Sequence, residues 1–144
     1  MILVDSNLLI YAHSKRSPQH AAAKTWLDDC LSRPGAVGLP WMSLLAFARI
    51  VTNPRVAENP ETISDAWLQV REWLGRRNVW IPQPGEQHAE IIGKLLMNSG
   101  FKANLVPDAH LAALAIEHGL TLCSADGDFA RFPGLNWLNP LSNA

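Results

Sequence analysis

The sequence has few cysteines, and they are not arranged as in a disulfide framework or a zinc site. Only Cys30 and Cys123 are present, with no Cys-x-x-Cys pair, which disfavours small disulfide-rich and zinc-binding classes.

Long apolar runs are also lacking. The most apolar stretch, residues 38–48, is interrupted by Pro40 and Ser43 and is too short to cross a bilayer. No basic segment followed by an apolar one opens the chain, so no secretory signal is expected. These absences predict a cytoplasmic protein without membrane association.

An excess of positive charge is absent too. The 144 residues carry 12 Lys and Arg against 13 Asp and Glu, a formal net charge of −1. Because proteins held to nucleic acid by bulk charge are strongly basic, any such contact here must come from a local patch or a metal. An apolar fraction of 48% and a charged fraction of 17% exclude wholesale disorder. The length predicts a single domain over residues 1–144.

Short apolar runs alternate with longer segments of helical periodicity. The runs that predict buried strands are residues 2–4, 36–39, 78–81, 120–123 and 136–138. The segments that predict helices are residues 17–32, with Ser17 as N-cap and Pro18 at the first position, then 40–52, 61–77, 86–98 and 107–118. This alternation predicts an α/β fold, a three-layer sandwich in which helices flank a small, mostly parallel sheet.

Four aspartates occupy the positions where ligands bind in such folds. Asp5 follows the first strand directly, and Asp126 and Asp128 follow the strand at residues 120–123. Asp108 lies in the first turn of the helix that leads into that strand. The carboxyl ends of parallel strands meet at one edge of the sheet, where ligands bind. We therefore expect these carboxylates to converge on one small volume.

Such a cluster is unfavourable without a cation, because like charges raise one another's pKa. Carboxylate oxygens are hard ligands that suit Mg²⁺ or Mn²⁺, and a metal-bound water can attack a phosphodiester. Each acid also has an ordinary structural explanation. Asp5 is a suitable helix cap, Asp108 has a favourable first-turn charge, and Asp126 and Asp128 belong to a common turn sequence.

Several stretches, taken in order, resemble PIN domains, and specifically the VapC-like toxins of type II toxin–antitoxin pairs. They are residues 2–12 (ILVDSNLLIYA), 39–56 (LPW to NPRV), 104–115 (NLVPDAHLAALA), 124–129 (SADGDF), 132–135 (FPGL) and Trp137. The resemblance implies a PIN-like fold and a Mg²⁺-dependent endoribonuclease, with Mn²⁺ as a possible substitute. It also implies an RNA substrate, a cognate antitoxin that neutralises the toxin, and a homodimer.

The resemblance further implies roles for particular residues. In the family, the Asp after the first strand and the Asp that opens the penultimate helix hold metal. The Asp of a Ser-x-Asp turn is the third catalytic carboxylate. Here the implied catalytic residues are Asp5, Asp108 and Asp126. Asp128 is the fourth predicted metal ligand, and Ser124 and Asn7 are predicted to support the site.

One position departs from the family pattern. Many members carry a Glu in the helix before a Phe-x-Arg segment, and this chain has Ala46 there, with no other acid at residues 32–56. Either fewer carboxylates hold the cation, or a second metal site is weak, or activity is low. A catalytically weakened PIN-like module that binds RNA or protein is therefore the alternative. Arg49 and Arg55 are candidate contacts to RNA phosphate, with a structural salt bridge as their alternative role.

Two other phosphoryl-transfer classes also begin with an Asp after the first strand. A haloacid-dehalogenase-like phosphatase needs a second Asp two residues later, where this chain has Asn7, and a receiver domain needs an acidic pair that is likewise lacking. The five histidines form no ligand-type pattern. The six tryptophans are expected mainly in the core or at an interface, although an exposed one is able to stack on a base.

Overall fold

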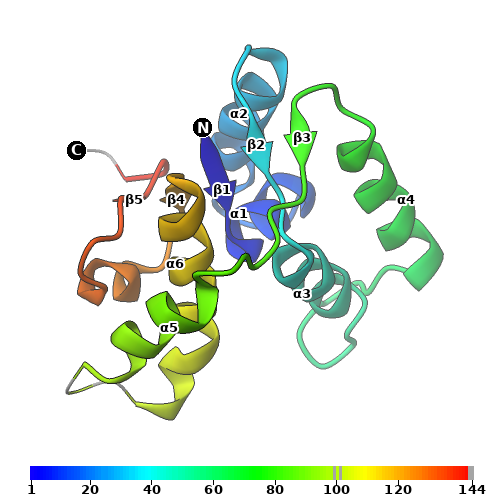
Figure 1. The fold of residues 1–144 in the computed structure, drawn as a ribbon. Coiled ribbons are helices and arrows are strands. Elements are labelled where there is room, and N and C mark those ends of the chain that lie inside the picture. The colour runs from blue at the N-terminus through cyan, green and yellow to red at the C-terminus, as the bar shows by residue number, and fades with distance from the viewer. Residues whose placement is uncertain (99, 101, 143–144) are drawn as a thin grey trace.

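The computed structural model describes residues 1–98, 100 and 102–142. Within them, short strands form one sheet in the order β3-β2-β1-β4-β5 (Figure 1). The strands are β1 (Ile2–Val4), β2 (Val37–Gly38), β3 (Val79–Trp80), β4 (Thr121–Cys123) and β5 (Trp137–Leu138). All four pairings between neighbours are parallel, so the predicted parallel sheet is confirmed, and each strand lies in a predicted segment.

Helices connect the strands and cover the sheet (Figure 1). In the described part of the chain they are α1 (Ser6–His13), α2 (His20–Ser32), α3 (Trp41–Val51), α4 (Ile63–Leu74), α5 (His88–Leu96) and α6 (Val106–His118). None of the described helices combines the length and hydrophobicity that crossing a bilayer requires.

The sheet separates two hydrophobic cores. Successive residues of a strand point to opposite faces, and Leu3, Val4, Leu122 and Cys123 are all fully buried. Val4 and Cys123 pack with apolar residues of α1, α2, α3 and α4. Leu3 and Leu122 pack on the other side with residues of α5 and α6. This arrangement is the predicted three-layer sandwich.

The predicted start of the second helix at Ser17 and Pro18 is wrong. Helix α2 begins at His20 instead. The backbone N–H of Ser17 donates to the carbonyl of Ser14, and the N–H of His20 donates to the carbonyl of Ser17, both at 3.0 Å. Because α1 and α2 are joined by only a short connection, Ser17 and Pro18 are used in two consecutive turns.

Gly119 places the helix that carries Asp108 directly before a central strand. It ends α6 with a left-handed φ of 66°, a conformation that glycine adopts without steric cost. Its N–H bonds to carbonyls of the last helical turn, and β4 begins at Thr121. The predicted end of this helix at Gly119 is confirmed.

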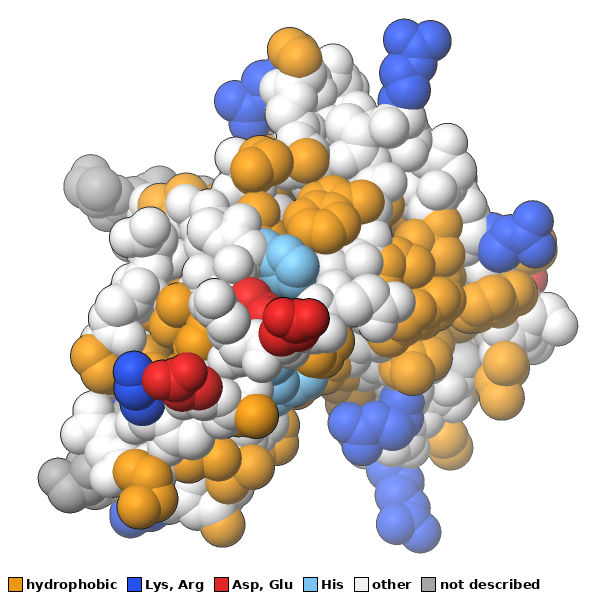
Figure 2. All heavy atoms as spheres, viewed as in Figure 1, with side chains coloured by type: hydrophobic (Ala, Val, Ile, Leu, Met, Phe, Trp, Pro, Cys, Tyr) orange, Lys and Arg blue, Asp and Glu red, His pale blue; other side chains and the backbone are white. Residues whose placement is uncertain are grey.

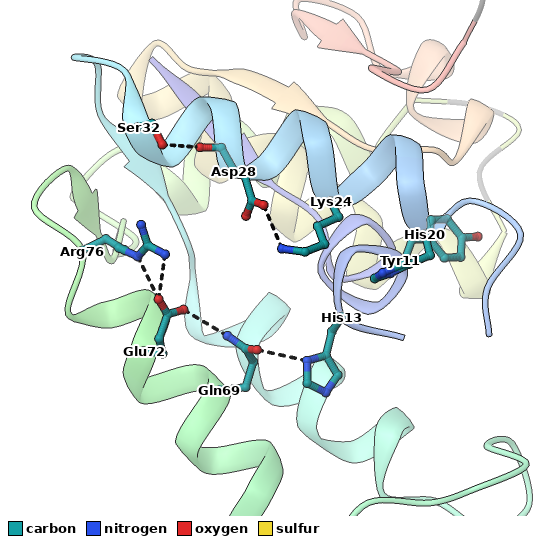
Figure 3. A network of polar contacts seen from close by, with 9 residues as sticks. All are labelled: Tyr11, His13, His20, Lys24, Asp28, Ser32, Gln69, Glu72 and Arg76. Carbon is teal, nitrogen blue, oxygen red and sulfur yellow. Dashed lines mark hydrogen bonds and ion pairs between the residues drawn. The ribbon is translucent and has the colours of Figure 1, made fainter. Parts of the chain in front are cut away.

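A chain of polar contacts holds α4 against the end of α1 (Figure 3). His13 Nδ1 lies 3.0 Å from Gln69 Oε1, and its Nε2 lies 2.7 Å from Glu61 Oε2. Gln69 then donates to Glu72 at 3.2 Å, and Glu72 pairs with Arg76 at 2.8 Å. These contacts tie α4 to the end of α1.

Candidate metal centre

Asp5 joins the two central strands and also caps a helix. Its backbone N–H donates to the carbonyl of Cys123 at 3.0 Å, which continues the pairing of β1 with β4. One carboxylate oxygen accepts the backbone N–H of Ser6 at 2.7 Å, so the helix-cap explanation holds. The other oxygen accepts the hydroxyl of Ser124, also at 2.7 Å. The carboxylate is therefore held in one orientation at the end of β1.

Ser124 organises the turn that follows β4. Its side chain is fully buried, and its hydroxyl oxygen accepts the N–H of Asp126 at 3.0 Å and the amide of Asn7 at 3.1 Å. The side-chain carbonyl of Asn7 in turn accepts the N–H of Ala125 at 3.3 Å. Ser124 and Asn7 thus place the turn carrying Asp126 against Asp5.

Three of the four predicted aspartates meet closely. Asp126 accepts the N–H of Asp128 at 2.9 Å, which starts the 3₁₀ turn η2 (Gly127–Arg131). Ligand oxygens of Asp108, Asp126 and Asp128 all lie within 4.8 Å of one another, and all three residues are half-buried. Asp5 is outside this group but close enough for its charge to act on Asp108.

Burial and mutual repulsion make the centre strongly acidic. Burial, followed by the charges of Asp126, Asp5 and Asp128, raises the pKa of Asp108 to about 6. Burial also raises the pKa of Asp5, with a further increase from Asp126, although the hydrogen bonds from Ser124 and Ser6 oppose it.

Cations do little to offset this charge. Among the described residues, the basic partner of these aspartates is Arg131, 3.8 Å from Asp128 and largely exposed. Such an exposed pair contributes little. A set of carboxylate oxygens with an uncompensated negative charge fits Mg²⁺ or Mn²⁺.

The PIN domain family model matches residues 2–135 of this chain. The chain belongs to the PIN domain family. Ribonuclease VapC37 of Mycobacterium tuberculosis is 41% identical over 140 residues, covering 97% of each protein. Ribonuclease VapC33 of the same species is 40% identical over 141 residues, covering 98% of this chain and 99% of that protein. The predicted resemblance to VapC-like PIN domains is therefore confirmed.

Solved PIN-domain structures share the fold. VapBC2 from Rickettsia felis, bound to a DNA fragment from its promoter, matches with a TM-score of 0.72 and 19% identity over 96% of this chain and 98% of that one. VapC20 of Mycobacterium tuberculosis, a sarcin–ricin loop cleaving toxin, matches with a TM-score of 0.68 and 19% identity. The match covers 94% of this chain and 99% of that one. At these identities the likeness establishes the fold.

The two arginines predicted to contact RNA, Arg49 and Arg55, are exposed. Ala46 is half-buried on α3. Arg49 lies near the end of α3 and Arg55 in the segment after it. Within residues 1–98, 100 and 102–142, neither guanidinium forms an ion pair, so the alternative of a structural salt bridge is not found. Nor does any described hydrogen bond join Arg49 or Arg55 to the aspartates.

A histidine contact between α5 and α6 was not predicted from the sequence. His88 Nε2 lies 3.1 Å from His110 Nδ1, and His110 follows Asp108 by two residues in α6. Burial, then the charge of His88, lowers the pKa of His110. Glu117, also on α6, accepts the backbone N–H of Gly85 at 2.8 Å. These residues belong to different segments, so no local spacing signals the contact.

A cavity of the described structure lies elsewhere. It has a volume of about 520 Å³ and is lined by residues of α1, α3 and the segments that follow them, including Ile10, Ile50 and Val56. None of the four aspartates lines it. The acidic centre therefore lies at the edge of the sheet and not in this cavity.

Proposed function

We propose that this PIN domain is a metal-dependent endoribonuclease that acts as the toxin of a toxin–antitoxin pair. The observation that carries the proposal is the approach of Asp108, Asp126 and Asp128 to within 4.8 Å at one edge of the sheet. The relatives support RNA as the substrate, because VapC37 and VapC33 are ribonucleases similar to this chain over nearly its whole length.

In this proposal Asp108, Asp126 and Asp128 hold Mg²⁺, or Mn²⁺ in its place, and Asp5 is a fourth ligand. The bound ion supplies a water that is easily deprotonated and a positive charge for the phosphate oxygens. Asp5, Asp108 and Asp126 are the catalytic carboxylates. Ser124 and Asn7 support them, since the bond from the Ser124 hydroxyl to Asp5 keeps that carboxylate in place. Arg49 and Arg55 contact RNA phosphates through their guanidinium groups.

A protein antitoxin is the proposed partner. The matching structures include the VapBC2 assembly and a toxin–antitoxin complex from Klebsiella pneumoniae, with a TM-score of 0.64 and 23% identity over 97% of this chain and 98% of that one. A basic side chain of the antitoxin that enters the acidic centre neutralises it much as a metal does. We further propose that residues 1–144 act as a single PIN-like domain, as a homodimer, in the cytoplasm.

Removal of the metal tests the proposed reaction. Purified protein in Mg²⁺ is expected to cut a long single-stranded RNA, and an excess of EDTA is expected to stop cleavage, because the acidic centre then lacks its cation. Addition of Mg²⁺ or Mn²⁺ beyond the EDTA restores cleavage. Gel analysis of end-labelled RNA measures the rate and separates internal cuts from trimming at the ends. Cleavage that continues unchanged in EDTA contradicts the proposal.

Ala46 favours the alternative function, a weakened module that binds RNA or protein, because alanine cannot contribute a ligand. By the family pattern, Ala46→Glu adds a carboxylate to the centre. It is expected to tighten Mg²⁺ or Mn²⁺ binding by about tenfold, since affinity rises with the number of charged ligands. Calorimetry measures the affinity.

Leu45→Glu is the matched control for this variant. Leu45 is 57% exposed on the same helix, so the substitution adds the same charge toward the solvent. Equal affinity of the Ala46→Glu variant and the unmodified protein contradicts the assignment of Ala46 to the family's glutamate position. Binding of RNA without cleavage by the unmodified protein, in either metal, favours the weakened module.

A further inference from the structure

We propose that Trp41 and Trp67 form a stacking platform for the bases of single-stranded RNA, beside the acidic centre. The inference rests on the proposed ribonuclease function and adds the part of the surface that holds the substrate next to the site of cleavage.

The sheet topology places Trp41 at the edge that carries the aspartates. Strand β2 runs parallel to β1, and Gly38 lies opposite Leu3. Asp5 follows Leu3 by two residues, and Trp41 follows Gly38 by three and begins α3. Both residues therefore leave the same edge of the sheet, on neighbouring strands that lie about 4.8 Å apart. The edge of the sheet that carries the acidic centre therefore also carries Trp41.

The two stacked rings remain partly open to solvent. Trp67, on α4, stacks on Trp41 with ring centroids 6.4 Å apart and planes inclined by 10°. Trp41 is 37% exposed and Trp67 41% exposed, although large aromatic residues are usually buried to a high degree. The contacts of His13 with Gln69 and Glu61 hold α4 in place, so the surface is formed before any ligand binds.

The positive end of α3 at Trp41 and two arginines unpaired within the described residues, Arg49 near the end of α3 and Arg55 after it, favour nucleic acid as the occupant. The first turn of α3 has no acidic residue, and the positive end of the helix dipole lies there. Arg49 and Arg55 are exposed and without ion pairs in the described part of the chain. Figure 2 shows hydrophobic side chains gathered over α3 and α4, with basic side chains beside them. Aromatic surfaces next to basic groups are typical of sites for single-stranded nucleic acid.

Binding of a short, fluorescently labelled single-stranded RNA in EDTA tests the platform without cleavage. Trp41→Ala and Trp67→Ala are each expected to weaken binding by about 5- to 100-fold, because stacking on one aromatic ring has an effect of that size. Trp67→Tyr keeps a ring and is expected to recover part of the affinity. An oligonucleotide with abasic positions is expected to bind the unmodified protein and the Trp67→Ala variant equally.

Leu68→Ala is the matched control. Leu68 is 64% exposed and follows Trp67 on α4, so its truncation removes apolar surface without removing a ring, and RNA affinity is expected to stay unchanged. In Mg²⁺, the Trp67→Ala variant is expected to raise KM for RNA and leave kcat near that of the unmodified protein, as for a lost binding contact. Circular dichroism verifies the fold of each variant. If an alanine variant does not fold, the RNA affinity of the Trp67→Tyr variant is compared with that of the unmodified protein instead.

Three results overturn the platform. Unchanged RNA affinity in both alanine variants contradicts it. An equal loss of affinity in Leu68→Ala indicates a general apolar face. Unchanged affinity together with dissociation of a dimer in the Trp67→Ala and Leu68→Ala variants, measured by sedimentation, assigns the face to contact between copies. If the unmodified protein still cleaves RNA in Mg²⁺, none of these three results contradicts the proposed ribonuclease function. Absence of both binding and cleavage in the unmodified protein overturns the two proposals together.

Discussion

Replacement of Asp126 with asparagine is expected to slow metal-dependent RNA cleavage by more than about 100-fold, since loss of a group that only supports a metal ligand already costs 10- to 100-fold. Asp126 lies within 4.8 Å of Asp108 and Asp128, and its charge raises the pKa of both Asp5 and Asp108. Asparagine keeps an oxygen for the N–H of Asp128, now bonded at 2.9 Å. The loss of cleavage activity is therefore caused by the missing charge and not by disruption of the turn.

The initial rate of RNA cleavage at fixed Mg²⁺ measures this effect, and growth arrest in cells that express the variant is expected to disappear with it. Asp65→Asn is the matched control, because Asp65 is exposed on α4 and far along the chain from the four aspartates of the metal centre. Asp5→Asn is expected to abolish cleavage as Asp126→Asn does. A cleavage rate in either variant close to that of the unmodified protein excludes that residue from the catalytic set.

Asp108→Asn is expected to stabilise the metal-free protein near neutral pH. The pKa of Asp108 rises from 3.8 to about 6 on folding, chiefly through burial and the neighbouring carboxylates. Because the folded state then binds the proton more tightly, this residue favours folding at low pH. Its contribution is lost as the pH rises through about 6. At pH 7 the ionised carboxylate opposes folding, and a neutral amide does not.

The expected gain is on the order of 1 kcal/mol, a value reduced because solvent screens this half-buried group, and the midpoint of thermal unfolding rises by about 2–4 °C. Thermal unfolding in EDTA, followed by circular dichroism from about pH 4 to about pH 8, measures it. The difference is expected to shrink toward the acidic end, where Asp108 is protonated in the folded state and becomes so in the unfolded state as the pH approaches its ordinary pKa of 3.8. Saturating Mg²⁺ reverses the order, because only the unmodified protein keeps its ligand set. A variant less stable than the unmodified protein in EDTA at pH 7 contradicts the assigned electrostatics.

Local patterns in the sequence were sufficient for the parallel sheet and for the edge where the acids lie. The apolar run before Asp5 and the one before Ser124 are short and bounded, as buried parallel strands require. Gly119 marks the end of α6, since the left-handed conformation there suits glycine. The helix starts were harder, as the error at Ser17 shows, because an N-cap sequence also fits a turn.

The sequence by itself determined the α/β class, the strand segments and the shared edge of the four aspartates, because each of these follows from apolar periodicity and from the direction of parallel strands. The tertiary structure alone decided which side chains touch. It bonded Asp5 to Ser124 across 119 positions, brought together Asp108, Asp126 and Asp128 with Asp5 beside them, and stacked Trp41 on Trp67. Such contacts join helices and turns that are distant in the chain, and their geometry depends on how whole elements pack on the two faces of the sheet.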